Sequence, residues 1–230
     1  VDVGWTLGVG GLAVAYALAG DGLAARRLLV GGMVGAWSLR LARHLWFDRI
    51  AGKPEEGRYR RLRELWGAKT QPRLLLFFLG QAVLAVLLSL AFLPGVGDTR
   101  PLDWLDAAAL LLWLIAWAGE TVADQQLGRF KADPANAGRV MDRGLWSWSR
   151  HPNYFFEWLL WIAFVLPGLA APGGLLALLA PAAMLVFVLK VTGIPPSEAQ
   201  AVRSRGEAYR AYQQRVSPFL PLPPRKEPLP

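Results

Sequence analysis

The sequence contains no cysteine and only two histidines among its 230 residues. Without cysteine the chain can form no disulfide, offers no thiolate nucleophile and cannot bind a metal through sulfur. Two histidines are too few to hold a zinc ion without several carboxylates, so we expect no metal site. These absences argue against a metalloenzyme and against thiol chemistry.

Charged side chains are also scarce, at 18% of residues, whereas hydrophobic residues make up 54% and include eleven tryptophans. A soluble domain of this length would need a more polar surface. The formal net charge of +8 would indicate nucleic acid binding in a soluble protein. Here the basic residues lie between apolar runs, where anionic membrane lipid accounts for them. We therefore predict an all-α, polytopic membrane protein that contacts membrane lipids and binds no nucleic acid.

Several apolar stretches are long enough to cross, or nearly cross, a hydrocarbon layer of ~30 Å. The six stretches cover residues 3–20, 28–47, 74–94, 102–119, 154–170 and 173–191. The first and fifth are short, so they require tilt or local thinning of the bilayer. No linker or low-complexity tract divides the chain, which predicts one membrane-embedded domain over residues 1–230.

Lysine and arginine are distributed unevenly between the connections. Residues 49–73 carry eight, residues 119–153 carry five and residues 190–230 carry seven, whereas the alternate connections carry only Arg26, Arg27 and Arg100. Cytoplasmic loops of membrane proteins are enriched in these residues. We therefore predict that the two long loops and the C-terminus are cytoplasmic in a multi-pass protein of a bacterial inner membrane.

Three polar residues interrupt the second apolar stretch. Arg40, Arg43 and His44 are spaced so that they share one face of a helix. They can extend toward the cytoplasmic headgroups, because Arg43 and His44 lie near the end of the stretch. Alternatively they line a polar cavity, for which the deeper Arg40 is the better candidate. The sequence leaves both interpretations open.

The fourth stretch is followed by polar residues at helical spacing. Glu120 and Asp124 lie one turn apart, and Lys131 follows two turns later. The pattern predicts a helix that leaves the membrane and continues. Glu120 and Asp124 either belong to a solvated helix end or bind the hydroxyl or amide groups of a ligand.

The run GLWSWSRHPNYFFEW, residues 144–158, concentrates polar side chains at the start of an apolar helix. Asn153 and Glu157 are four residues apart and share a face, and the free amides of the helix N-terminus lie beside Arg150 and His151. An anionic group would be stabilised there. The alternative is that Asn153 only caps the helix and that His-Pro shapes the turn. We favour a phosphate-bearing cofactor at the cytoplasmic face.

Motifs along most of the chain resemble the membrane-embedded steroid 5α-reductase superfamily, in particular its bacterial branch known as a domain of unknown function. They are DVGW-LG, W-LRLARHL, GKPEEGRY, ADQQLGRFKADPANAGRVMDRGLWSWSRHPNYFFEW, GIPPSE and Y-AY-QRVSPFLP. The RHPNY element alone is less specific, because sterol reductases and isoprenylcysteine-type methyltransferases contain similar elements. The combination is typical of the reductases.

The resemblance implies a seven-helix reductase that takes hydride from NADPH and reduces a carbon-carbon double bond conjugated to a ketone. One further helix is then expected before Val1. Asn153, Tyr154 and Glu157 match the asparagine, tyrosine and glutamate of the family's cofactor site, and Asp124 matches its aspartate on the preceding helix. The other residues expected on the cofactor side are Glu120, Lys131, Arg139, Arg143, Arg150, His151, Glu198, Tyr209 and Tyr212.

Within that set, the three arginines are candidates for the diphosphate or the 2′-phosphate, because guanidinium groups suit bidentate contacts. Lys131 falls where the family has a basic residue near the nucleotide. Glu198 lies near the position of a C-terminal histidine of the animal enzymes, so this chain departs from the family pattern there.

The substrate end matches the family less closely. Its members use an acid on an early helix and a tyrosine on the next to engage the substrate carbonyl. Asp2 is the counterpart of the acid, whereas the tyrosine position aligns with Trp37 beside Arg40. We expect Asp2 to hydrogen-bond the carbonyl oxygen, with Arg40 or His44 as further catalytic candidates. Asp2, Trp5 and Trp37 are the expected substrate-binding residues, and the substrate is a lipidic enone such as a 3-oxo-Δ4-steroid.

Two other functions fit parts of the same pattern. A membrane methyltransferase would hold the carboxylate and amine of S-adenosylmethionine around RHPNY and Glu157. A non-catalytic lipid-binding protein would bind no nucleotide at all. The long ADQQLGRFKADPAN run and the DVGW start favour the reductase.

Overall fold

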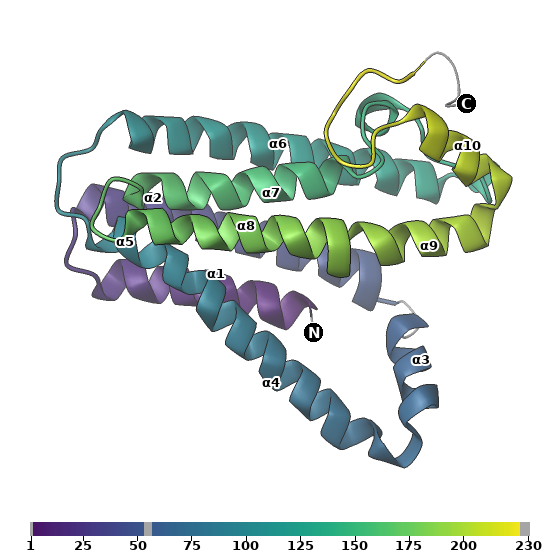
Figure 1. The fold of residues 1–230 in the computed structure, drawn as a ribbon, viewed down its shortest axis with the longest axis horizontal. Coiled ribbons are helices and arrows are strands. Elements are labelled where there is room, and N and C mark those ends of the chain that lie inside the picture. Colours follow the sequence, from purple (N-terminus) through teal and green to yellow (C-terminus); the bar gives the residue numbers. More distant parts are fainter. Residues whose placement is uncertain (1, 53–56, 226–230) are drawn as a thin grey trace. The chain divides into compact units, whose positions relative to one another are not determined.

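The computed structural model of the protein describes residues 2–52 and 57–225. The described chain is predominantly α-helical and contains no β-strand; its only strand-like contact is an isolated bridge between Ser149 and Ser217. The helices are shown in Figure 1. The GKPEEGRY motif falls partly outside the described residues.

By its internal contacts the chain divides into two compact units, each built from two stretches of sequence. Unit 1 comprises Val1–Ala107 with Phe164–Ala177, and unit 2 comprises Ala108–Ala163 with Leu178–Pro230. The helices of unit 1 are α1 (Asp2–Ala19), α2 (Ala24–Leu45), α3 (Gly57–Trp66), α4 (Thr70–Ser89) and α5 (Leu93–Gly97). The helices of unit 2 are α7 (Pro152–Val165), α8 (Leu179–Val186), α9 (Ile194–Arg205) and α10 (Glu207–Arg215), together with most of α6 (Trp104–Ala132).

Helices α1 and α2 approach each other so closely that small residues are required at the contact. A Cβ atom added at Gly10 would overlap the side chain of Ser38, and one added at Gly31 would lie 2.7 Å from the Cβ of Ala17. Small residues at such contacts let membrane helices pack backbone to backbone. The Ser38 hydroxyl also donates to the Thr6 carbonyl oxygen at 2.9 Å, which ties the two helices together.

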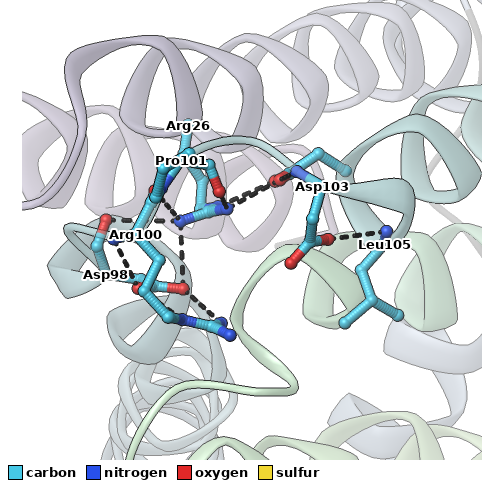
Figure 2. Close-up of polar contacts among 7 residues, drawn as sticks. Arg26, Asp98, Arg100, Pro101, Asp103 and Leu105 are labelled. Carbon is cyan, nitrogen blue, oxygen red and sulfur yellow. Dashed lines mark hydrogen bonds and ion pairs between the residues drawn. The ribbon is translucent and has the colours of Figure 1, made fainter.

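A buried charge cluster joins the start of α2 to the connection between α5 and α6 (Figure 2). The fully buried Arg26 donates from Nε and Nη2 to both carboxylate oxygens of Asp106, at 2.8 and 2.7 Å. Its Nη1 lies 3.0 Å from Asp98 Oδ2. The carbonyl oxygens of Arg100 and Pro101 accept further hydrogen bonds from the guanidinium, at 2.9 and 2.8 Å. Two acids and three carbonyl oxygens therefore surround this cation.

The same cluster sets the first residue of α6. Asp103 Oδ1 accepts from the amide of Leu105 at 2.8 Å, and Asp106 Oδ2 accepts from the amide of Asp103 at 2.9 Å. This reciprocal arrangement is a capping box, which satisfies two amides that a helix start otherwise leaves without partners. Asp106 therefore stabilises α6 in two ways, as a cap and as the partner of Arg26.

Four helical stretches are long and apolar enough to cross a membrane. They are Asp2–Ala19, Leu62–Gly97, Trp104–Ala132 and Gly174–Arg205. Many of their large apolar side chains are exposed, including Leu76, Leu111 and Leu175, as expected for a surface that contacts lipid. The chain is therefore an integral membrane protein with an all-α fold, which confirms the predicted fold class.

The two other predicted segments are also helical but do not qualify by length and composition. Helix α2 carries four arginines, and α7 has only 14 residues before the chain turns into a 3-10 helix at Leu166–Gly168. The sixth predicted segment is less regular than expected, because a π-helical turn at Phe187–Val191 joins α8 to α9. In Figure 1, α8 and α9 follow each other along nearly one line.

Candidate functional site

The candidate site in unit 2 lies where α6 and α7 face each other. The amide Nδ2 of Asn153 on α7 lies 3.5 Å from Asp124 Oδ1 on α6. Three residues later along α7, the Phe156 ring lies close to Gly119, so closely that a Cβ there would overlap it. The later residue of α7, Phe156, therefore contacts the earlier residue of α6, Gly119. The two helices are antiparallel. The one-turn step from Asn153 to Glu157 therefore corresponds to the step from Asp124 back to Glu120.

This register gathers four residues predicted on the cofactor side onto two facing helices: Glu120, Asp124, Asn153 and Glu157. Glu120 is buried, and Asp124, Asn153 and Glu157 are half-buried. Glu157 Oε1 accepts a hydrogen bond from Trp161 Nε1 at 3.0 Å, which orients this carboxylate. As expected, α6 is one continuous helix through Glu120, Asp124 and Lys131. Asn153 is the second residue of α7 rather than its cap, because the helix begins at Pro152.

The side-chain oxygen of Asn153 is buried and accepts no hydrogen bond from any described residue. Its amide nitrogen faces the Asp124 carboxylate, which can only accept, and this fixes which way the amide points. A buried acceptor without a donor costs about 1–3 kcal/mol. The oxygen is therefore a candidate acceptor for an amide or hydroxyl group of a ligand.

The loop before α7 is attached to α6 by three features. Gly144 has φ +58°, a conformation that favours glycine, and a Cβ there would overlap the Gln126 side chain. The Leu145 amide donates to Gln126 Oε1, and Trp146 Nε1 donates to the Ala123 carbonyl oxygen, both at 3.0 Å. These contacts hold the start of α7, and hence Asn153, at a fixed level beside α6.

Tyr154 and His151 lie on another side of the same helix start. Their rings stack with centroids 5.3 Å apart and planes 6° from parallel. The Tyr154 hydroxyl lies 3.1 Å from Ser197 Oγ on α9. Both residues therefore connect the start of α7 to α9.

Arg150 and Glu198 form an ion pair that attaches the C-terminal helices to the start of α7. Arg150 Nε lies 2.6 Å from Glu198 Oε1, and Nη1 donates to the carbonyl oxygens of Gln213 and Val216, each at 2.7 Å. Gln213 Nε2 donates to the second Glu198 oxygen at 2.8 Å, and His151 Nε2 lies 3.4 Å from the first. The pair thus has a structural role, and the predicted contact of both residues with a cofactor stays a prediction. We call Arg150, His151, Glu198 and Gln213 the C-terminal clamp.

Tyr209 and Tyr212 belong to the packing of α10. The Tyr212 hydroxyl donates to the carbonyl oxygen of Trp146, and the two tyrosine rings meet edge to face at 5.6 Å. Burial raises the pKa of Tyr209 to about 12 and raises the pKa of Tyr212 further above its usual range. Both phenols are therefore neutral near neutral pH. Their predicted contact with a cofactor stays a prediction.

The cations predicted at the phosphates lie at the end of α6 and in the connection that follows it. Lys131, Arg139 and Arg143 are all exposed, and the Arg139 carbonyl oxygen accepts from Arg205 Nε at 2.8 Å. Their exposure leaves them accessible to an anionic group from water, but their role at phosphates stays a prediction.

The residues predicted at the substrate end all belong to unit 1. Asp2 and Trp5 lie at the start of α1, and Trp37, Arg40 and His44 lie on α2. Trp37 is fully buried with its ring edge-on to Phe164 at 5.5 Å, whereas Asp2, Trp5, Arg40 and His44 are half-buried. Arg43 is exposed and its guanidinium lies 5.5 Å from the centre of the Phe47 ring, which fits the headgroup interpretation for that residue. The catalytic and substrate-binding roles at this end stay predictions.

A family model described as "Protein of unknown function (DUF1295)" matches residues 1–216. The chain belongs to the DUF1295 family. The match covers the candidate residues of both ends, from Asp2 to Tyr212. An uncharacterized protein of Schizosaccharomyces pombe is 29% identical over 236 aligned positions, which cover 88% of this chain. The chain spans 65% of the length of that relative. No solved structure matches it.

One polar residue of this DUF1295 protein escaped the sequence analysis. Trp117 lies on α6, one turn before Glu120, and stacks on Trp113 with ring centroids 5.1 Å apart and planes 14° from parallel. Its indole Nε1 is buried and donates to no described residue. The spacing of Trp113 and Trp117 was a possible signal, but in an apolar helix such a pair usually indicates core packing.

The described chain contains no group of three or more histidine, cysteine, aspartate or glutamate side chains placed to hold a metal ion. The chemistry of the site in unit 2 is that of hydrogen bonding. It offers carboxylate acceptors and the Asn153 amide oxygen, with the Trp117 N–H as a neutral donor.

Proposed function

We propose that this DUF1295 protein is an NADPH-dependent membrane reductase, which transfers hydride to the carbon-carbon double bond of a lipidic enone such as a 3-oxo-Δ4-steroid. The motifs that resemble the steroid 5α-reductase superfamily support this proposal along most of the chain. The observation that carries it is the buried acceptor Asn153 Oδ1, held beside Asp124 between α6 and α7. Such an oxygen matches an amide donor of the kind that nicotinamide presents.

The residues present fit the cofactor in their hydrogen-bonding types. Asn153 and Asp124 would hold its amide and hydroxyl groups, with Glu157 oriented by the Trp161 N–H. The exposed cations Lys131, Arg139 and Arg143 would bind its phosphates from the aqueous side. NADPH, when bound, supplies the hydride.

The chain's own residues would have to stabilise the charge that develops on the substrate. Addition of hydride to the β-carbon places negative charge on the carbonyl oxygen, and preorganised donors at that oxygen lower the barrier. We assign this role to the carboxyl group of Asp2 in its protonated form, which can donate a hydrogen bond, with Arg40 as a second donor and His44 as the alternative. Protonation of the α-carbon completes the reduction.

The orientation proposed for the protein places the long loops and the C-terminus in the cytoplasm of a bacterial inner membrane. The three basic residues on the other side are all engaged in the fold. Arg26 pairs with Asp98 and Asp106, Arg100 pairs with Asp98, and Arg27 donates to the carbonyl oxygens of Ala17 and Leu18. Little positive charge therefore remains there to oppose this orientation.

Nucleotide titration of the purified protein in mild detergent tests the proposed cofactor. We expect NADPH to bind, more tightly than NADH, and to bind less tightly as salt is added, since exposed cations are screened. Asn153→Ala should weaken nucleotide binding about 5- to 150-fold, the range for one lost partner of a buried polar group. Gln125→Ala, which changes an exposed neighbour of Asp124, is the matched control and should change nucleotide affinity little.

Tight binding of S-adenosylmethionine without any response to NADPH would instead support a methyltransferase. No binding of either would support a non-catalytic lipid-binding protein.

A second pair of variants separates the two ends of the site. Glu157→Ala should weaken nucleotide binding, whereas Asp2→Asn should leave it nearly unchanged and lower the turnover of an enone by the NADPH-loaded protein. The difference is expected because a donor to the developing enolate acts mainly on the transition state. The Asp2 variant should also keep the wild-type melting temperature. If Asp2→Asn abolishes nucleotide binding, or Glu157→Ala binds normally, the assignment of the two ends is wrong.

A further inference from the structure

Trp117 presents a hydrogen-bond donor whose direction is fixed but whose partner is not supplied by the described chain. Its Nε1 is buried without an acceptor, and the stacking of its ring on Trp113 holds the indole plane. Trp113 is only 8% exposed, so it is a fixed support on which the half-buried Trp117 ring stacks. A donor held in this way is preorganised, because a ligand need not order it on binding.

The position of Trp117 makes the missing acceptor costly. Trp117 lies within the apolar part of α6, a helix long and apolar enough to span the membrane, where no bulk water satisfies a buried polar group. Asp124 lies seven positions further along α6, so the two residues share one face of the helix, about 10 Å apart along its axis. The donor at Trp117 and the acceptor at Asn153 thus lie at two levels of the same side of unit 2.

The neighbours of Trp117 restrict the chemistry of the acceptor. The stretch of α6 around Trp117 is apolar, and an anionic group buried there without a cationic partner is costly. The half-buried indole of Trp117, supported by Trp113, offers an apolar surface of the kind that a ring system or lipid chain contacts. A neutral oxygen on an apolar molecule satisfies both conditions.

We propose that Trp117 donates a hydrogen bond to a neutral oxygen, a carbonyl or hydroxyl group, of the lipid ligand. The Trp117 ring, supported by its stack on Trp113, provides the apolar wall against which that ligand lies. This inference rests on the proposed function, which supplies the lipid substrate. It places that substrate in unit 2, beside the residues proposed to bind the nucleotide. It names a specificity-determining residue on α6, within unit 2.

The test removes the Trp117 N–H from the protein and, separately, removes each possible acceptor oxygen from the steroid used as probe. The probe is a 3-oxo-4-ene steroid with a second ketone at C17, used with two analogues that lack either the C3 or the C17 oxygen. Equilibrium binding in detergent is measured for the wild type and for Trp117→Phe, which keeps an aromatic ring and loses the N–H. The matched control is Trp104→Phe, on the same helix and 75% exposed. We expect Trp117→Phe to weaken binding of the diketone about 5- to 10-fold and to leave binding of one of the two analogues unchanged.

Equal losses for all three steroids, or no loss for any, would overturn the proposal, and so would a wild-type protein that binds none of them. Replacement of Trp117 by benzothienylalanine keeps the bicyclic ring and removes only the N–H, so it gives the same test if the phenylalanine variant unfolds. NADPH titration of the wild type is kept separate. Failure to bind NADPH would reject the reductase, whereas the selective loss of steroid binding in Trp117→Phe would still support the hydrogen bond.

Discussion

Arg26 and Asp106 form a bidentate ion pair across 80 residues of sequence, with both side chains almost completely buried. Removing one partner of a buried pair leaves an uncompensated charge, at a cost of about 3–5 kcal/mol. We therefore expect Arg26→Met and Asp106→Leu each to lower the melting temperature strongly. The double variant should recover part of the loss, since it leaves neither of these two charges alone.

The coupling between Arg26 and Asp106 is obtained from the melting temperatures of the two single variants and the double variant. Tryptophan fluorescence in detergent follows the unfolding, because the chain has eleven tryptophans. Arg100→Gln is the control, since the Arg100 side chain is 44% exposed and its loss should cost much less. Strictly additive effects of the two single changes would contradict the importance of the pair.

Asp98 makes acid stability a second test of this cluster. Hydrogen bonds from the Arg100 side chain are the main cause that lowers the pKa of Asp98 below its ordinary 3.8, and Arg26 adds to the effect. A carboxylate with a lowered pKa stabilises the fold above the ordinary value, and this contribution is lost as the pH falls toward the folded-state pKa. The melting temperature should therefore drop as the pH falls below 3.8. Asp98→Asn should be less stable at neutral pH and should show a smaller drop over that acidic range; an unchanged drop would exclude Asp98 as its source.

Variants of the C-terminal clamp should lose local stability, whereas variants of the residues proposed to bind the nucleotide should lose NADPH affinity. Glu198→Ala removes the carboxylate that Arg150 and Gln213 contact, so we expect α9 and α10 to detach more readily. Trypsin should then cleave faster at Arg203 and Arg205, while NADPH affinity falls less than in Asn153→Ala. Glu207→Ala is a control, since Glu207 lies on α10 with its side chain 88% exposed. If Glu198→Ala resists trypsin normally but loses NADPH, then Glu198 contacts the cofactor as the sequence suggested.

Topology reporters test the orientation. A reporter after Pro230, near Asn136 or near Glu55, which lies outside the described residues, should report cytoplasm. One at Pro172, in an exposed turn, should report periplasm. Insertion near Asp98, in the connection with few basic residues, should also report periplasm. It is a poorer choice than Pro172, because Asp98 belongs to the buried charge cluster and an insertion there would disturb the fold. One insertion reporting the opposite side would require a different number of membrane crossings.

The helices and their polar faces were predictable from the sequence because both depend on local periodicity. The continuation of α6 past Glu120 and the shared face of Asn153 and Glu157 follow from helical spacing alone. The meeting of Asn153 with Asp124 was expected only from the resemblance, since periodicity does not say which helices are neighbours.

Long-range pairing was not predictable in this way. Arg26 was counted as a loop charge, although 72 and 80 residues along the chain Asp98 and Asp106 neutralise it. The ion pair of Arg150 with Glu198 was not visible either, because the two residues lie 48 positions apart in the sequence. Trp117 was missed for the opposite reason, since an indole in an apolar helix does not reveal whether its N–H has an acceptor.

The close contact of α1 with α2 has a consequence for how the protein enters the membrane. Because Gly10 and Gly31 let the two helices touch along their backbones, little lipid needs to be displaced between them once they have met. Arg27 donates to the carbonyl oxygens of Ala17 and Leu18 at the end of α1. Its side chain is therefore already hydrogen-bonded within the α1–α2 hairpin. Helices α1 and α2 can therefore pack as a hairpin during synthesis, whereas the buried Arg26 at the start of α2 finds its acidic partners only once Asp98 and Asp106 have been added.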